Sequence, residues 1–181
     1  RPGEEAGALE VEELAATSRP AHAALWRFLA GIDLVAEIEY EAGLDDPLPH
    51  LLVDRRAARG RPVDRLWVRL VEVDRALAGR RYAVEVDLVL EVEDEFCPWN
   101  TGRFRLCGDG ETATCVRTSA PADLRLTATE LGAAFLGGTT LTSLAAAGRV
   151  REERPGALAR ASRAFRGERE PFYPGGWAFP L

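Results

Sequence analysis

The C-terminal segment of the chain, residues 171–181, has the composition that most suggests chemistry. It contains four aromatic side chains among prolines and glycines, which keep it from being helical. Disordered tails are usually polar and poor in aromatic residues, so this tail is predicted to dock into a binding groove through Trp177 and Phe179. A docked tail would hold the terminal carboxylate of Leu181 at a fixed place, where it could act as a ligand or a base. The alternative is that the tail only covers an apolar patch of its own domain.

A second candidate is the segment Arg105-Leu106-Cys107-Gly108-Asp109-Gly110, which has the R-x-x-G-x-G spacing of loops that hold a pyrophosphate. Such a loop needs a strand that leads into a helix, so that backbone N–H groups and the helix N-terminus face the phosphates. Here no helical pattern follows Gly110, and the carboxylate of Asp109 would repel phosphate. The sequence therefore favours a tight turn between two strands.

The other residue types that carry chemistry form no recognisable catalytic group. His22 lies in a predicted helix and His50 in a proline-rich loop, and neither belongs to an arguable Ser/His/Asp or Cys/His triad. The acidic residues at 91–95 are either a solvated rim or a site that attracts a cationic substrate. Cys107 and Cys115 are expected to face each other across a hairpin as small core residues.

The overall composition is that of a globular protein with an acidic surface. Of 181 residues, 46% are hydrophobic and 29% are charged, and the formal net charge is −6. This charge argues against nucleic acid or an anionic membrane as a partner and suits a cationic substrate such as an amine. No apolar run reaches the roughly 18 residues of a membrane span. The three cysteines, with no C-x-x-C pair, predict a cytoplasmic protein without disulfides or a structural metal.

Residues 1–62 predict a strand, a helix and a second strand. A short strand is expected at residues 8–14. Ser18 is expected to cap a helix that ends at Gly31, and alternating residues at 34–40 predict a half-buried strand. These three elements are too few for a domain. They are therefore either an extension of the domain that follows or the last part of a domain that begins earlier in the protein.

A polar linker at residues 55–62, rich in arginine and containing Gly and Pro, predicts a domain boundary. The chain contains no methionine and begins with Arg1. We therefore expect it to be part of a longer protein.

Residues 63–170 predict an α+β domain. The expected strands are at residues 66–70, 82–92, 103–107, 112–118 and 122–127, and the second of these has the most regular alternation. A short helix is expected to begin at Asp74, and three more at residues 129–136, 142–147 and 156–166. This order predicts a mostly antiparallel sheet with helices on one face. The small and apolar residues of the helices would either line a lipid tunnel or, more commonly, fill a core.

Several segments, read together, are familiar in their order and spacing. They are residues 25–29, 33–35, 45–55, 64–70, Ala76-Leu77-Ala78-Gly79-Arg80-Arg81-Tyr82, 100–106, 131–138 and 144–150. They resemble the C-terminal part of the enhanced intracellular survival family of GNAT-type N-acetyltransferases, which is found in actinobacteria and relatives. The resemblance covers about residues 20–170.

The resemblance implies an organisation for the whole chain. Residues 1–62 would be the last part of a central, degenerate GNAT-like domain, residues 63–170 a sterol-carrier-protein-2-like domain, and residues 171–181 the tail. Members of the family acetylate amines, including those of an aminoglycoside and of lysine side chains, with acetyl-CoA, and they are often hexameric. Their active site and acetyl-CoA site lie in an N-terminal GNAT domain, which the resemblance places before Arg1.

The resemblance also implies a role for the end of the chain. In the family the terminal carboxylate reaches the active site as the general base, and this role carries over to Leu181 alone. Family chains typically end in an aromatic residue, whereas this one ends Phe179-Pro180-Leu181. The chain is therefore expected to supply the base and to support assembly, and to be inactive by itself. A lipid-binding module and a purely structural or oligomerisation domain are the alternatives.

Overall fold

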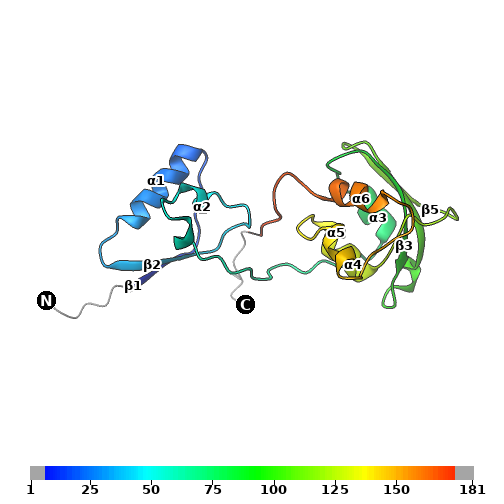
Figure 1. The fold of residues 1–181 in the computed structure, drawn as a ribbon, viewed down its shortest axis with the longest axis horizontal. Coiled ribbons are helices and arrows are strands. Elements are labelled where there is room, and N and C mark those ends of the chain that lie inside the picture. The colour runs from blue at the N-terminus through cyan, green and yellow to red at the C-terminus, as the bar shows by residue number, and fades with distance from the viewer. Residues whose placement is uncertain (1–6, 174–181) are drawn as a thin grey trace. The chain divides into compact units, whose positions relative to one another are not determined.

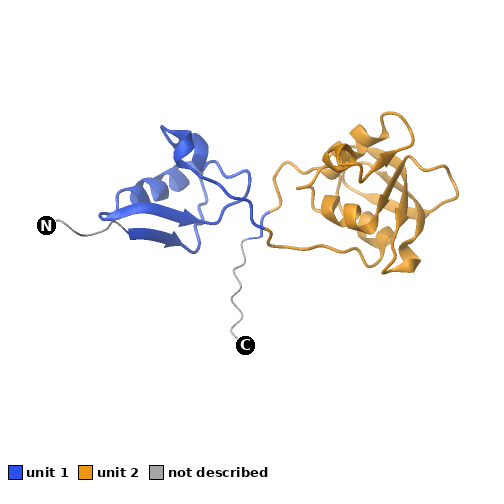
Figure 2. Ribbon diagram, turned by 60° about the horizontal axis from the view of Figure 1, so that its bottom comes forward, with its two compact units in different colours: residues 1–63, 172–181 blue, residues 64–171 orange. Residues whose placement is uncertain are grey.

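The computed structural model describes residues 7–173 of the chain. These residues divide into two compact units (Figure 2). The first contains the described residues up to Val63 together with Phe172 and Tyr173, and the second contains Asp64–Pro171. The chain thus leaves the first unit after Val63 and returns to it after Pro171.

The first unit contains two parallel strands and the helix that connects them. Strand β1 (Gly7–Val11) pairs in parallel with β2 (Val35–Tyr40), and helix α1 (Arg19–Ala30) lies between them in the sequence (Figure 1). The expected cap is confirmed, because the Ser18 side chain accepts a hydrogen bond of 3.3 Å from a first-turn amide. The helix ends at Gly31, as predicted.

Two short helical segments, α2 (Leu48–Leu51) and η1 (Arg55–Ala57), follow in this unit. Of its described residues only Trp26 is buried. The indole N–H of Trp26 donates to Nε2 of His22 over 3.2 Å, and its ring meets that of Tyr40 edge-on with centroids 5.4 Å apart. His22 is therefore a packing partner of Trp26. Two strands and one buried side chain are fewer than an independently stable sheet domain has.

The second unit is built on a five-stranded sheet of order β5-β4-β3-β6-β7. Its strands are β3 (Val86–Glu93), β4 (Gly102–Gly108), β5 (Ala113–Arg117), β6 (Leu124–Thr127) and β7 (Arg151–Glu152). Three of the four neighbouring pairs are antiparallel, and only β3 and β6 run parallel. The predicted α+β class with a mostly antiparallel sheet is confirmed.

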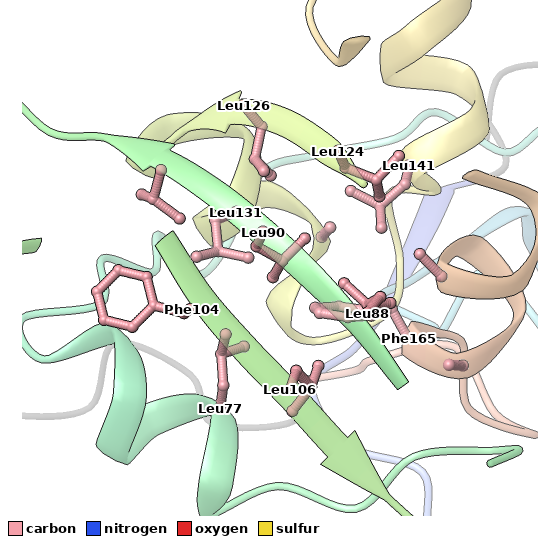
Figure 3. Packing of buried hydrophobic residues seen from close by; sticks show 14 of the residues in the cluster. Leu77, Leu88, Leu90, Phe104, Leu106, Leu124, Leu126, Leu131, Leu141 and Phe165 are labelled. Atoms are coloured by element: carbon pink, nitrogen blue, oxygen red, sulfur yellow. The ribbon is translucent and has the colours of Figure 1, made fainter. Parts of the chain in front are cut away.

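Four helices cover one face of this sheet (Figure 1). They are α3 (Val73–Ala78), α4 (Ala128–Phe135), α5 (Leu141–Ala146) and α6 (Ala157–Phe165), and a turn of 3₁₀ helix, η2 (Pro98–Asn100), precedes β4. Alternate residues of β3 point into the core, where Leu90 from the sheet and Leu131 from α4 are fully buried (Figure 3). The alternating apolar residues of β3 therefore correctly identified the face of the strand that the helices cover.

The strand expected at residues 66–70 is wrong, because residues 64–70 form no strand. Leu66 is 56% exposed and Trp67 is 84% exposed. The segment is held by side-chain and helix contacts instead of sheet pairing. The Arg69 guanidinium pairs with Asp94, and the carbonyl of Val68 lies against α4 at Gly132. Apolar alternation over so few residues did not distinguish a strand from an extended connection.

Two further differences concern the start of β3 and an additional strand, β7. The long strand expected to begin at Tyr82 begins at Val86, because the amide of Ala83 donates to the carbonyl of Ala164 in α6 over 2.9 Å. Strand β7 was not predicted, since its two residues are both charged and carry no alternating apolar pattern.

Candidate functional site

The predicted site residues Leu181, Trp177 and Phe179 lie outside the described residues, which end at Tyr173. The described part of the tail, residues 166–173, shows how the segment that carries them begins. The candidate site described below therefore consists of the residues that contact this part of the tail.

Arg80 joins the C-terminal ends of α4 and α6. One of its guanidinium nitrogens donates to the carbonyl of Phe135 over 2.5 Å and another to the carbonyl of Phe165 over 2.7 Å. Phe135 and Phe165 are the last residues of their helices, whose final carbonyls have no partner within the helix and carry partial negative charge. The planar fork of an arginine can satisfy two such carbonyls at once.

Aromatic rings surround the same guanidinium. Its central carbon lies 4.5 Å from the ring centroid of Phe165, 4.7 Å from that of Tyr82 and 5.6 Å from that of Phe135. Burial lowers the pKa of Arg80 from its ordinary value, while neighbouring Tyr82 acts in the opposite direction. An arginine remains protonated despite such a shift, so Arg80 is a permanent cation at this junction.

The loop after α4 forms the surface on which the tail begins. Gly137 has a φ of +93°, and a Cβ added there would lie 2.9 Å from the carbonyl oxygen of Phe165 and 3.3 Å from the amide nitrogen of Gly167. A Cβ added at Gly138 would lie 2.9 Å from Cγ of Pro171. Both glycines therefore permit a close approach of the tail that a side chain would block.

The tail then enters the first unit. A Cβ added at Gly43 would make ordinary van der Waals contact with Phe172, at 3.6 Å from its Cβ. Before Pro171 in the chain, the Arg166 guanidinium pairs with the carboxylate of Glu170, four residues further along the chain. Within the second unit, Pro171 thus lies close to Gly138, and within the first unit, Phe172 lies close to Gly43.

The acidic residues at 91–95 are of two kinds: Glu93 and Glu95 are exposed, as expected for a solvated rim, whereas Glu91 and Asp94 are paired with arginines. Glu91 accepts from Arg103 over 2.7 Å and pairs with Arg125 over 3.2 Å, on the solvent face of the sheet. Asp94 is 5% exposed and pairs with Arg69. The charges of Glu91 and Asp94 are therefore already balanced by arginines, and the hypothesis of a site for a cationic substrate finds no support in this pair.

The predicted hairpin at Arg105–Gly110 is confirmed, with β4 and β5 antiparallel on either side of the turn. The Asp109 carboxylate accepts hydrogen bonds from the amides of Glu111 over 3.0 Å and Thr112 over 2.8 Å. These amides, which a phosphate would need, are occupied by the protein's own side chain. The segment is a turn and not a pyrophosphate loop.

The expectation that Cys107 and Cys115 face each other is wrong. Cys115 pairs with Leu106 and Cys107 with Thr114, so the two thiols lie on opposite faces of the sheet. Burial raises the pKa of Cys115 to about 12. Burial and a hydrogen bond to Asp87 also raise the pKa of Cys107. Neither thiol is activated as a nucleophile.

The interface between sheet and helices is filled. Leu90, Leu131 and Ala134 have no exposed surface, and they belong to one cluster of buried residues contributed by the sheet and by the helices (Figure 3). Two hollows among the described residues lie elsewhere: one of about 340 Å³ beside Asp87 and Cys107, and one of about 170 Å³ beside Trp99. The burial of these residues favours a filled core, the commoner of the two expected outcomes, over a lipid tunnel.

Residues 7–173 offer neither a metal site nor a membrane-spanning helix. No cluster of His, Cys, Asp and Glu with the arrangement of a metal site was found in this range. Within the same residues, no helix is both long and apolar enough to cross a membrane.

Comparison with known families matches both parts of the chain. Residues 73–174 match the sterol carrier protein domain family, and residues 1–70 match an acetyltransferase (GNAT) domain family. The chain belongs to the Eis family of GNAT-type N-acetyltransferases, as its similarity to Eis proteins of Mycobacterium also shows. The suspected membership in the enhanced intracellular survival family is thereby confirmed, together with its sterol-carrier-like domain.

Individual relatives agree with this membership. An uncharacterized N-acetyltransferase of Streptomyces avermitilis is 52% identical over 172 residues, which are 94% of this chain and 42% of the relative. The N-acetyltransferase Eis of Mycobacterium tuberculosis is 42% identical over 160 residues, or 86% of this chain and 38% of the relative. The chain thus spans about two fifths of the length of the curated Eis-family relatives it matches.

Solved structures of N-acetyltransferases are similar as well. The crystal structure of Eis1 from Mycobacterium abscessus superimposes with a TM-score of 0.81 at 37% identity, over 95% of this chain and 44% of that chain. A GCN5-related N-acetyltransferase from Anabaena variabilis gives a TM-score of 0.79 at 27% identity, over 90% of this chain and 42% of that chain.

The motifs that carried the resemblance turn out to be structural. Arg80 joins two helix ends, Asn100 is a buried hydrogen-bonding centre, and Arg149 pairs with the buried Glu130 of α4 over 2.6 Å. Gly132 allows α4 to lie against the carbonyl of Val68. The local sequence does not indicate these roles, because the partners are far apart in the chain and only the fold brings them together.

Proposed function

We propose that this chain is the C-terminal portion of an acetyl-CoA-dependent amine N-acetyltransferase and that its tail supplies the catalytic base. In this proposal the acetyl-CoA site and the acceptor site lie in a GNAT domain that precedes these residues in the longer protein. The observation that carries it is the order of the two family matches, an acetyltransferase domain at residues 1–70 followed by a sterol carrier domain at residues 73–174.

The first unit supports an origin in a larger domain. Its two strands are parallel, and parallel strands are normally buried within larger sheets. Phe28, Leu34 and Leu44 are 69%, 64% and 73% exposed. A pair of strands with so little buried surface is stabilised best when further elements cover it.

Leu181 is proposed as the general base through its terminal carboxylate, while Trp177 and Phe179 dock the tail. Leu181 lies eight residues beyond Tyr173. Eight residues reach at most about 29 Å when fully extended, which limits how far the active site can lie from the end of the described tail. A free α-carboxyl has a pKa near 3.5 and accepts a proton from an ammonium poorly. A dry or acidic cleft that raises this pKa would make the carboxylate an adequate base.

The proposed acceptors are primary amines, including those of an aminoglycoside or of lysine side chains, and the proposed site of action is the cytoplasm. The acidic net charge of −6 favours such cationic acceptors. Assembly into a homo-oligomer, a hexamer by analogy with the family, is a concurrent role of this part of the protein. A lipid-binding role has no support in the filled core.

The proposal is tested with the full-length gene product and a panel of polyamines and aminoglycosides, by following the release of the CoA thiol. Removal of residues 177–181 is expected to lower kcat at least 100-fold, in the range typical of a lost general base, while the fold is retained. Unchanged turnover after this deletion would mean that the tail only covers an apolar patch of its own domain. No turnover of any amine by the intact protein would contradict the proposed activity itself.

A further inference from the structure

The imidazole of His22 takes part in the packing of the first unit as a hydrogen-bond acceptor. Its Nε2 accepts the indole N–H of Trp26 over 3.2 Å, from four residues further along α1. An indole N–H can only donate, so Nε2 must carry a free lone pair, and the imidazole must be neutral in this arrangement. His22 therefore holds the ring of Trp26 in only one of its two protonation states.

Trp26 is the side chain that attaches α1 to the sheet of this unit. It is the only buried side chain among the unit's described residues, and its ring meets that of Tyr40 in β2 edge-on, with centroids 5.4 Å apart. Burial raises the pKa of Tyr40 above its ordinary value, and the charge of Asp46 acts in the same direction. Tyr40 therefore stays uncharged at neutral and acidic pH, and the attachment has one titratable member in that range, His22.

The charged groups on the packed elements offer a protonated imidazole no counter-ion. Arg19 and Arg27 share α1 with His22, and both are cations. Since alternate residues of a strand point to opposite faces, the carboxylates of the strands lie on the face that does not carry Tyr40; they are Glu10, Glu37 and Glu39. Asp46, which acts on Tyr40, accepts the amide of Leu48 over 2.8 Å. Within residues 7–173, His22 forms no ion pair.

We propose that His22 is a pH-sensitive switch in the first unit, whose protonation releases Trp26 and weakens the attachment of α1 to β2. A proton on Nε2 turns the acceptor into a second donor directed at the indole N–H, so the hydrogen bond is lost. Histidine is the side chain that ordinarily changes charge between pH 5 and pH 8. This inference goes beyond the proposed function and does not depend on the terminal carboxylate.

The direction of the effect follows from proton binding. A folded state that needs the neutral imidazole binds fewer protons than the unfolded chain, so the stability of the first unit falls as the pH drops through the range in which histidine titrates. The loss is concentrated in one place, because no other described side chain of this unit is buried. The amides of α1 and β2 should therefore open more often in acid.

The test is hydrogen exchange of the α1 and β2 amides in the full-length protein at pH 7.5 and pH 5.5, with each rate corrected for intrinsic exchange at that pH. In the parent protein we expect protection to fall about 10-fold at the lower pH, which corresponds to one lost hydrogen bond. His22→Gln retains an acceptor oxygen whose charge is constant over this range, so its protection should change less than threefold. His50→Gln, which removes the other histidine of the chain, is the matched control and should behave like the parent.

His22→Ala gives a second variant in case glutamine does not place its oxygen correctly. It lacks the acceptor at both pH values, so its protection should be low and equally low at each. An unchanged protection in the parent would overturn the proposal. An equal fall in the parent and in both His22 variants would overturn it as well, since another group would then be responsible. The readout does not involve turnover, so it is independent of whether the proposed acetyltransferase activity is found.

Discussion

The side-chain amide of Asn100 donates a hydrogen bond to Oδ2 of Asp94 over 3.0 Å, and both side chains are buried. The same amide nitrogen also donates to the carbonyls of Leu70 and Val71, while the Asn100 carbonyl oxygen accepts from the amide of Val73 over 3.1 Å. This pair therefore ties the loop before β4 to the extended segment that leads into α3. It explains how residues 64–71 keep their place without pairing to the sheet.

Replacing Asn100 with alanine is expected to destabilise the second unit by about 1–3 kcal/mol, because buried polar partners are left without a hydrogen bond. The free energy of unfolding is measured in urea, with hydrogen exchange of the β3 and β4 amides as the probe. These amides belong to the second unit, so the measurement reports on this unit alone. Thr114→Ala on the exposed side of β5 is the control and should change the free energy of unfolding by less than about 0.5 kcal/mol. A loss for Asn100→Ala as small as that of the control would show that the network contributes nothing.

The stability of the second unit should depend on pH through Asp94. Burial alone would raise the pKa of this carboxyl, but hydrogen bonds from Asn100 and from the amides of Cys97 and Phe96, together with the charge of Arg69, hold it below its ordinary value. A group whose pKa is lowered in the folded state contributes stability above its unfolded pKa of about 3.9, and this contribution is lost as the pH falls through the lower folded value.

The free energy of unfolding of the parent chain is therefore expected to fall more steeply than that of Asp94→Asn between about pH 5 and pH 2. The variant is less stable at pH 7, so the two curves should converge at low pH. Parallel curves over this range would mean that Asp94 is not the group responsible.

Gly132→Ala should destabilise the second unit although alanine is the better helix former. The added Cβ would lie 2.5 Å from the carbonyl oxygen of Val68, a backbone atom that cannot move without displacing the segment. A loss of about 1–3 kcal/mol is expected from overpacking, against a gain of at most about 1 kcal/mol from helix propensity. Gly60→Ala, where nothing lies within 4 Å of the added Cβ, is the matched control. Thermal unfolding decides, and a raised Tm for Gly132→Ala would refute the close approach.

Arg149→Met should leave the buried carboxylate of Glu130 without its cation. Glu130 also accepts from the amide of Thr127 over 3.0 Å, which completes the capping box of α4. The pair is half-exposed on the arginine side, so a loss of about 1–3 kcal/mol is expected, between the values for exposed and fully buried pairs. The double variant Arg149→Met with Glu130→Gln should recover part of this loss in chemical unfolding. A double variant no more stable than Arg149→Met would argue against an uncompensated charge as the cause.

The sequence was a good guide wherever a local pattern determined the structure. Ser18 and Gly31 marked the ends of α1, the alternation from Val86 onward identified β3, and the glycines between β4 and β5 predicted the turn. Each depends on neighbours within a few residues. It failed at residues 66–70 and at β7, where the outcome depends on distant partners and the local pattern is short or absent.

The candidate site was predictable to a smaller extent. The composition of the tail drew attention to Leu181, but nothing local to Arg80 indicates that it meets the last carbonyls of two helices, 55 and 85 residues further along the chain. Arg69 and Asp94 likewise come together only because the fold brings the segment before α3 beside the loop after β3. An ion pair or a helix-end contact of this kind leaves no periodicity in the sequence.

The central claim, that the terminal carboxylate is the base, is tested most directly by changing that group alone. Semisynthesis of the full-length protein can replace the carboxylate of Leu181 with a carboxamide and leave every side chain in place, with the semisynthetic carboxylate as control. If the carboxylate is the base, kcat should be at least 100-fold lower for the carboxamide, with KM for acetyl-CoA changed less than twofold. Equal kcat values for the two proteins would contradict it.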